Sequence, residues 1–412
     1  LDAHLLAFRE SLSTIPNAAY KHYMAWLLET QSHNVQWQKL IALEPLMKMT
    51  RQLLDRLLTL EEQQAIIPYI AKMNVLQVYE VVSDNLAIGL VATNKHDIRR
   101  DVMKIFNEVT VRRLLGETVD YAAHYYPYQG GLRDVSAFEQ SLSPDKHRQM
   151  AELYRQSVQG VDLYPIEYSM YSQLVANTES AKSVIDALDG RYSQELVRSS
   201  LIRRYRDSGV WLHETRLNIE DLYYFGTGSI MVVPTLGYYI GVIAEILRDM
   251  PGYPTLIAND SLNNALEMAA LLVRLLNDIG SHLLIGNNEL REQVMRDIYR
   301  EHWQTGRNLY EIIPNLFEHM PSIYTRLRKD IVFGEYNILL AAAKDDLECF
   351  NTYLYHAAQC YRSTREALQH TLIEIDATLK SDLISNIVMR FVGYHEHLYS
   401  QPSNTLEGEY AI

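Results

Sequence analysis

Apolar residues recur at spacings of three and four along nearly the whole chain, and no segment keeps the apolar–polar alternation of a half-buried strand. The Ser143-Pro144-Asp145 run predicts a capped helix start, and Asp189-Gly190 predicts a helix end. The pattern predicts helices over 17–30, 33–57 with a bend at Pro45, 61–92, 97–125, 145–158, 166–176, 179–189, 193–206, 211–225, 230–249, 261–285, 288–305, 308–318, 322–329, 333–378 and 381–399. We therefore expect an all-α protein.

The helical pattern suggests a coarse division of the chain. Residues 1–95 are expected to form an N-terminal helical layer, residues 96–400 one large α-helical bundle, and residues 401–412 a polar, loose tail. No repeat of fixed period is present, which argues against a solenoid.

The composition excludes some classes of function. The 412 residues carry 38 Lys and Arg against 51 Asp and Glu, a net charge of -13, which argues against broad nucleic-acid binding. The two cysteines, Cys349 and Cys360, imply no disulfide framework and fit a reducing compartment. No run of eighteen apolar residues predicts a membrane span. We expect a cytoplasmic protein without a nucleic-acid partner, and a homodimer is compatible with the sequence.

The residues around Asn277 carry the strongest chemical signal. Asn277 and Ser281 stand four apart in a predicted helix, so their oxygens share one face, and Asp278 is adjacent. These are hard oxygen ligands of the kind that Mg²⁺ takes together with phosphate oxygens. The set predicts a magnesium site that assists departure of a diphosphate.

Residues 274–281, Arg-Leu-Leu-Asn-Asp-Ile-Gly-Ser, resemble the second metal-binding motif of class I terpene synthases. Upstream, residues 224–229, Tyr-Phe-Gly-Thr-Gly-Ser, are similar to the broken helix that carries Thr-Gly-Gly in bacterial members of that family. The resemblance implies an isoprenoid-synthase-type bundle, a lyase that ionises a prenyl diphosphate with Mg²⁺ to give a terpene.

The resemblance also implies roles for individual residues. Asn277, Asp278 and Ser281 would bind metal and Arg274 the diphosphate, while Thr227 and Gly228 would face the reacting centre. The aromatic rings of Tyr121, Tyr125 and Tyr224 would stabilise a carbocation through their π faces. The 29 tyrosines against 8 phenylalanines suit such a pocket, and equally suit half-exposed helix faces.

The sequence departs from the family at three places. The ligand Glu of the second motif is replaced by Ile285, and the diphosphate-sensing Arg before the Thr-Gly pair is replaced by Tyr224. No Asp-Asp-x-x-Asp occurs, so Asp120 with Glu117 would supply the opposing metal-binding face.

Two other classes of function stay open. A dimetal oxygenase with iron or manganese would use carboxylate and imidazole ligands on facing helices, although Glu-x-x-His is absent. Its candidate ligands are Glu117, Asp120 and His124, expected on one helix face, with Asp278 and His282. The third class is a helical interaction protein without chemistry. An arginine cluster at 198–206 could grip a diphosphate or form a solvated helix end.

Overall fold

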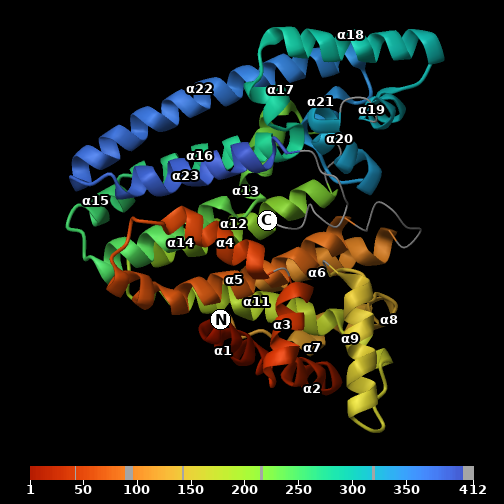
Figure 1. The fold of residues 1–412 in the computed structure, drawn as a ribbon, viewed down its shortest axis with the longest axis vertical. Coiled ribbons are helices and arrows are strands. Elements are labelled where there is room, and N and C mark those ends of the chain that lie inside the picture. Colours follow the sequence, from red (N-terminus) through yellow and green to blue (C-terminus); the bar gives the residue numbers. More distant parts are fainter. Residues whose placement is uncertain (42, 89–95, 142, 214–216, 318–320, 402–412) are drawn as a thin grey trace. The chain divides into compact units, whose positions relative to one another are not determined.

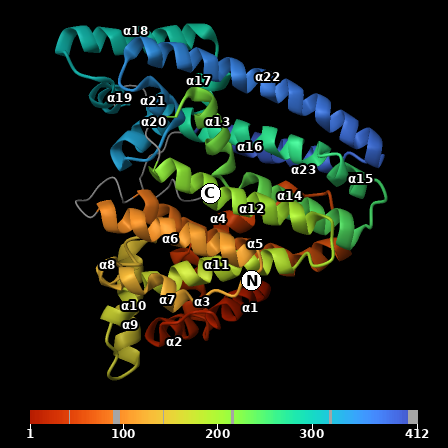
Figure 2. The same ribbon diagram turned by 180° about the vertical axis from the view of Figure 1, so that it is seen from behind.

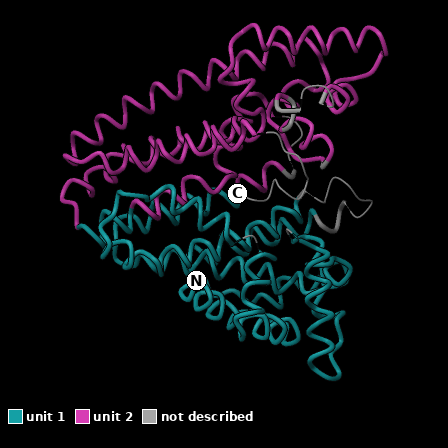
Figure 3. The backbone as a smooth tube through the Cα atoms, in the orientation of Figure 1, with its two compact units in different colours: residues 1–206, 241–248, 406–412 teal, residues 207–240, 249–405 magenta. Residues whose placement is uncertain are grey.

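The structure is a computed structural model that describes residues 1–41, 43–88, 96–141, 143–213, 217–317 and 321–401 (Figure 1). All regular elements in these ranges are helices, which confirms the expected all-α class. The chain divides into two compact units (Figure 3). Unit 1 holds residues 1–206 and 241–248, and unit 2 holds residues 207–240 and the described residues from 249 onward. The boundary expected at residue 95 and residues 402–412 of the tail expected over 401–412 lie outside the described residues.

Unit 1 is built around α5 (Leu60–Ile88), a helix of 29 residues, which packs against α1 (Asp2–Leu12), α6 (His96–Leu114) and α11 (Met170–Asp186). Its core contains several packed aromatic side chains. The rings of Phe8 and Trp37 pack edge to face with their centroids 4.6 Å apart, and the ring centroids of Tyr23 and Tyr154 lie 5.6 Å apart. Its helices are α1 (Asp2–Leu12), α2 (Ala18–Leu27), α3 (Gln31–Leu40), α4 (Leu43–Leu54), α5 (Leu60–Ile88), α6 (His96–Leu114), α7 (Tyr121–Tyr125), η1 (Tyr126–Tyr128), α8 (Gln129–Arg133), α9 (Pro144–Ser157), α10 (Tyr164–Glu167), α11 (Met170–Asp186), most of α12 (Ser193–His213) and the π-helical η2 (Val242–Leu247).

Unit 2 is organised around α16 (Ser261–Ile279), which packs against α13 (Ile219–Gly228), α20 (Pro321–Phe333), α22 (Leu347–Leu379) and α23 (Leu383–Leu398). The long α22 also packs against α23 (Figures 1 and 2). Its helices after α12 are α13 (Ile219–Gly228), α14 (Val232–Gly241), α15 (Tyr253–Ala258), α16 (Ser261–Ile279), α17 (Ser281–Ile285), α18 (Asn288–Thr305), α19 (Leu309–Phe317), α20 (Pro321–Phe333), α21 (Ile338–Ala343), α22 (Leu347–Leu379) and α23 (Leu383–Leu398).

Several predicted helices have the observed bounds within a few residues, among them α5, α18 and α23. The single helix expected over 33–57 is wrong, because α3 and α4 are separate and Pro45 lies in the first turn of α4, where its missing N–H costs nothing. The two helices expected over 166–189 are one helix, α11. The N-terminal helix α1 was not expected.

Within the described ranges, no single helix is long and apolar enough to cross a membrane. The pair formed by α13 and the α14–η2 segment reaches that length and composition only together, and it is bent by 41° at the break between them.

Candidate functional site

Helix α16 ends before the motif is complete. Gly280 has φ of 90°, a backbone conformation that glycine adopts without strain, and α17 begins at the next residue. Asn277 therefore lies in the last turn of α16, whereas Ser281 opens α17. The continuous helix expected over 261–285 is wrong at Gly280. The burial expected for its apolar residues Leu266, Ala270, Val273 and Leu284 is confirmed.

Asp278 is fully buried, and its carboxylate accepts hydrogen bonds from a guanidinium, from a backbone N–H and, at 3.3 Å, from the Asn277 side-chain amide. Arg274, one turn earlier, places Nη2 2.9 Å from Oδ1 and Nε 3.2 Å from Oδ2, and the backbone N–H of Ile338 donates to Oδ2 at 2.7 Å. The indole of Trp211 covers the guanidinium at 4.7 Å. Burial raises the pKa of Asp278, while Arg274 and the Ile338 N–H oppose that rise. Both carboxylate oxygens are thus engaged by the protein itself.

Asn277 and Ser281 are also engaged. Arg326 of α20 donates from Nη2 to Asn277 Oδ1 and from Nε to the Asn277 carbonyl, both at 2.8 Å, and its guanidinium lies 4.8 Å from the Tyr399 ring centroid. Ser281 is buried, and its hydroxyl donates to the Glu396 carbonyl of α23. Asn277 therefore links α16 to α20 through hydrogen bonds, and Ser281 links α17 to α23.

The network continues into α20 and α21. The amide of Asn337 donates at 2.6 Å both to the Asp278 carbonyl and to Asp330 Oδ2, and Lys329 pairs with Glu335 at 2.9 Å. Burial raises the pKa of Asp330 to about 8, opposed by Lys329. Sequence reasoning missed Arg326, Asp330 and Asn337. Asn337 could have been predicted as the N-cap of α21, because an asparagine before an apolar run is typical of that position. Its side chain accepts a hydrogen bond from the Leu340 N–H.

A helix break is present near the expected segment 226–229, but it lies at 229–231, so its placement at Gly226 and Gly228 is wrong. Helix α13 runs through Gly228, and α14 begins at Val232. Thr227 and Gly228 are buried, but the Tyr224 side chain is 59% exposed. Gly226 lies inside α13 and serves packing: a Cβ there would lie 2.8 Å from Trp211 and 2.9 Å from Ile338. α13 packs directly against α16, so the two segments of the resemblance lie together in unit 2.

The acidic face expected at Glu117, Asp120 and His124 is not a helix face. Gly116, at φ of 91°, follows α6, and residues 117–120 precede α7, whose N-cap is Asp120. The Asp120 carboxylate accepts the Ala123 N–H at 3.0 Å. Arg112 joins the other two residues, with Nε 2.7 Å from Glu117 Oε2 and Nη1 2.8 Å from His124 Nε2. A protein guanidinium therefore lies between these candidate ligands.

The aromatic candidates fall in different units. Tyr121 and Tyr125 belong to unit 1: the Tyr121 hydroxyl donates to Glu179, and buried Tyr125 meets Tyr171 edge to face. Tyr224 belongs to unit 2. Likewise Asp120 is in unit 1, and Asp278 and His282 are in unit 2, so the convergence of the two acidic sets stays a prediction.

The arginine cluster contributes to a buried network in unit 1. Arg204 is buried and donates to Glu80 at 2.9 Å and to Asp84 at 2.6 Å. Glu80 also accepts from Asn177 and Tyr205. Arg204 is therefore neither a solvated residue nor a donor available to a diphosphate in this structure.

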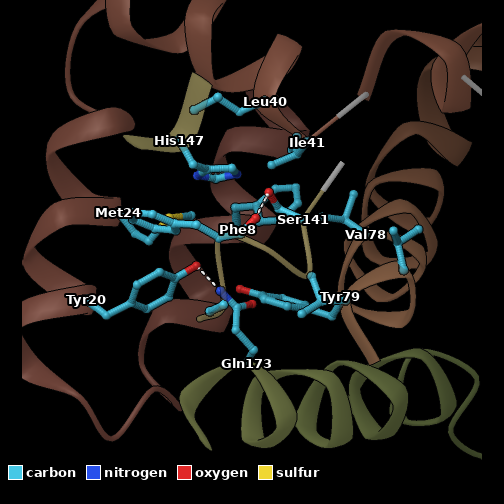
Figure 4. Close-up of a pocket in the computed structure, with 14 residues that line it drawn as sticks. Phe8, Tyr20, Met24, Leu40, Ile41, Val78, Tyr79, Ser141, His147 and Gln173 are labelled. Atoms are coloured by element: carbon cyan, nitrogen blue, oxygen red, sulfur yellow. Dashed lines mark hydrogen bonds between the residues drawn. The ribbon is translucent and has the colours of Figure 1, made fainter. Parts of the chain in front are cut away.

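Unit 1 contains a small pocket lined mainly by aliphatic and aromatic side chains, together with Ser141, His147 and Gln173 (Figure 4). The Gln173 amide donates to the Tyr20 hydroxyl across it. At a volume of about 40 Å³ it has room for a few water molecules, since one needs about 10–15 Å³. It is too small for a prenyl diphosphate.

The residues of the motif do not fit Mg²⁺ as they are arranged. Asn277 Oδ1 and the Asp278 carboxylate accept from arginines, and the position of the third family ligand is the half-exposed Ile285. Within the described ranges, no group of three or more His, Cys, Asp or Glu side chains is placed to hold a metal ion.

Comparison with known proteins returned no family model, no curated protein and no solved structure that matches this chain. The likeness to terpene synthases accordingly rests on the residues of the two motifs alone.

Proposed function

We propose that this chain is a helical binding protein, and that the motif residues of unit 2, which resemble the second metal-binding motif of terpene synthases, hold no metal ion. One observation supports this proposal above the others: the guanidinium groups of Arg326 and Arg274 already lie against the oxygens of Asn277 and Asp278. They supply the positive charge that a divalent ion would bring to these ligands.

The energetics favour the same interpretation. Asp278 is fully buried, and its partner Arg274 is nearly so. Removing one partner of a buried ion pair costs about 3–5 kcal/mol, because the other charge stays behind without compensation. A metal ion at Asp278 would have to displace Arg274 from its contact and leave that cation unpaired under Trp211.

A second candidate is the ionisation of a prenyl diphosphate, and the position of the helix break favours it. Helix α13 ends directly after Thr227-Gly228 and packs against α16, which carries Asn277. This function requires Arg326 to leave Asn277 so that the amide oxygen becomes available. The oxygenase alternative has no comparable support, since Arg112 holds both Glu117 and His124.

Ligand-dependent stability separates the two candidates. The free energy of unfolding of the wild-type chain is measured with Mg²⁺, with inorganic diphosphate, and with both together. A ligand at one hundred times its Kd raises that free energy by about 2.7 kcal/mol. The binding-protein proposal expects no increase specific to the combination. An increase that disappears in Asn277→Ala but persists in Glu374→Gln, an exposed site on α22, would overturn it.

Product formation gives an independent test. The chain is incubated with Mg²⁺ and geranyl, farnesyl or geranylgeranyl diphosphate, and extracts are analysed for hydrocarbons and alcohols by mass spectrometry. We expect no product above a no-protein control. A terpene whose formation requires Asn277 would establish the second candidate.

A further inference from the structure

A cleft lies within unit 1, whereas the motif residues 274–281 belong to unit 2. It has a volume of about 220 Å³ and is formed by α1, α5, α6 and α11. Its lining residues are Ala7, Glu10, Ser11, Thr14, Lys72, Val75, Arg113, Glu179, Ser180, Lys182, Ser183 and Asp186. Of these lining residues only Ala7 and Val75 are apolar, and the hydrocarbon parts of the polar side chains also line the cleft.

The ionic side chains of the cleft balance. Three are cationic, Lys72, Arg113 and Lys182, and three are anionic, Glu10, Glu179 and Asp186. A molecule that carries both signs meets both sets.

One of the three pairs is closed. Arg113 holds Glu179 through Nε at 2.7 Å and Nη2 at 3.1 Å, and the Tyr121 hydroxyl donates to the same carboxylate. Glu179 thus has a donor on each oxygen. This pair forms a fixed wall of the cleft.

The other two pairs are open. Lys72 donates to Ser183 Oγ at 3.1 Å and lies 3.6 Å from Glu10, and Lys182 pairs with Asp186 one turn further along α11. Each ammonium has three N–H donors, so each keeps capacity beyond its contacts with described residues. The Ser183 hydroxyl accepts from Lys72 and can still donate its own proton. These ion pairs are partly exposed and contribute little to stability, so they can exchange partners at little cost.

We propose that this cleft binds a small zwitterion, a compound of the amino-acid class with one carboxylate and one ammonium group. The ligand carboxylate accepts from Lys72 and Ser183, and the ligand ammonium donates to Asp186. Ala7 and Val75 contact its short carbon chain. The size agrees, because the cleft is smaller than the roughly 300–1,000 Å³ of pockets for drug-sized ligands.

Three probes with the same five-carbon chain test the charge requirement. They are δ-aminovalerate, a zwitterion; glutarate, a dianion; and cadaverine, a dication. Binding is measured by calorimetry or ligand-observed NMR, with β-alanine and ε-aminocaproate to vary the separation of the charges. We expect at least one ω-amino acid to bind at about millimolar Kd, and glutarate and cadaverine at least about tenfold more weakly. Equal or tighter binding of glutarate, or binding of none, would overturn the proposal.

Two variants test the location. Lys72→Met keeps the length of the side chain and removes its positive charge. Asp186→Asn keeps the shape of the side chain and removes its negative charge. Each should weaken binding about tenfold or more, since a hydrogen bond to a charged group is lost. Lys104→Met, at an exposed position on α6, is the matched control and should leave the Kd unchanged. If both cleft variants keep the wild-type Kd and the wild-type melting temperature, the ligand binds elsewhere on the protein and the proposed site is wrong.

Discussion

Replacement of Asp278 by Asn is the sharpest test of the buried network in unit 2. The substitution keeps the shape of the side chain and removes its charge. Arg274, which is 8% exposed, then loses the carboxylate that neutralises it beneath Trp211. The Ile338 N–H keeps an oxygen acceptor, so the backbone contact contributes little to the change.

The magnitude follows from the burial of both partners. Breaking a buried ion pair from one side costs about 3–5 kcal/mol, and the amide oxygen that replaces the carboxylate returns about 1 kcal/mol as a neutral acceptor. We expect the free energy of unfolding of unit 2 to fall by about 2–4 kcal/mol. In Arg274→Met/Asp278→Asn the uncompensated cation is gone, so the double variant should be more stable than Asp278→Asn alone.

Urea denaturation followed by tryptophan fluorescence measures this loss, because Trp211 lies against Arg274. The exposed Glu374→Gln serves as the control and should change the free energy by less than about 0.5 kcal/mol. A loss below about 1 kcal/mol in Asp278→Asn, or a double variant no more stable than the single one, would refute the description of this pair as a structural element.

Further tests address packing and pH dependence. Gly226→Ala should destabilise unit 2 by about 1–3 kcal/mol because its Cβ has no space, whereas Gly393→Ala, with nothing within 4 Å, should stabilise α23 by about 0.5–1 kcal/mol; denaturation curves compare the two. The pKa of Asp330 is raised from 3.8 to about 8, so the folded state binds the extra proton and stability falls by up to about 1.4 kcal/mol per unit as pH rises between these values. Asp330→Asn should remove that decline in denaturation measured across the range. Burial lowers the pKa of His147 from 6.5 to about 4, so its contribution is lost as pH falls through that interval. His147→Phe should weaken the acid dependence of the unfolding of unit 1, and an unchanged dependence would contradict this assignment.

Local sequence determined the helical class and many element positions. The three-and-four spacing of apolar residues places α5, α18 and α23 close to their observed bounds, because that spacing reflects the geometry of a single helix. The glycines at 226 and 228 indicated a disturbance before α14, and the break follows them. These features depend on neighbours in the chain, which a sequence displays directly.

Only the tertiary structure decided what the polar residues do. Arg326 lies far along the chain from Asn277, and the sequence of neither segment predicts a contact between them. The contact forms because α20 packs against α16. The same holds for Arg204, which the sequence allowed as a solvated residue and which folding buries against Glu80. Gly280 has a positive φ, so Asn277 and Ser281 lie in different helices. The spacing of four residues places two side chains on one face only in an unbroken helix. The spacing of polar residues in the sequence predicts which side-chain oxygens lie next to each other. The donors that bind those oxygens come from other helices, and the packing of the helices decides which donors they are.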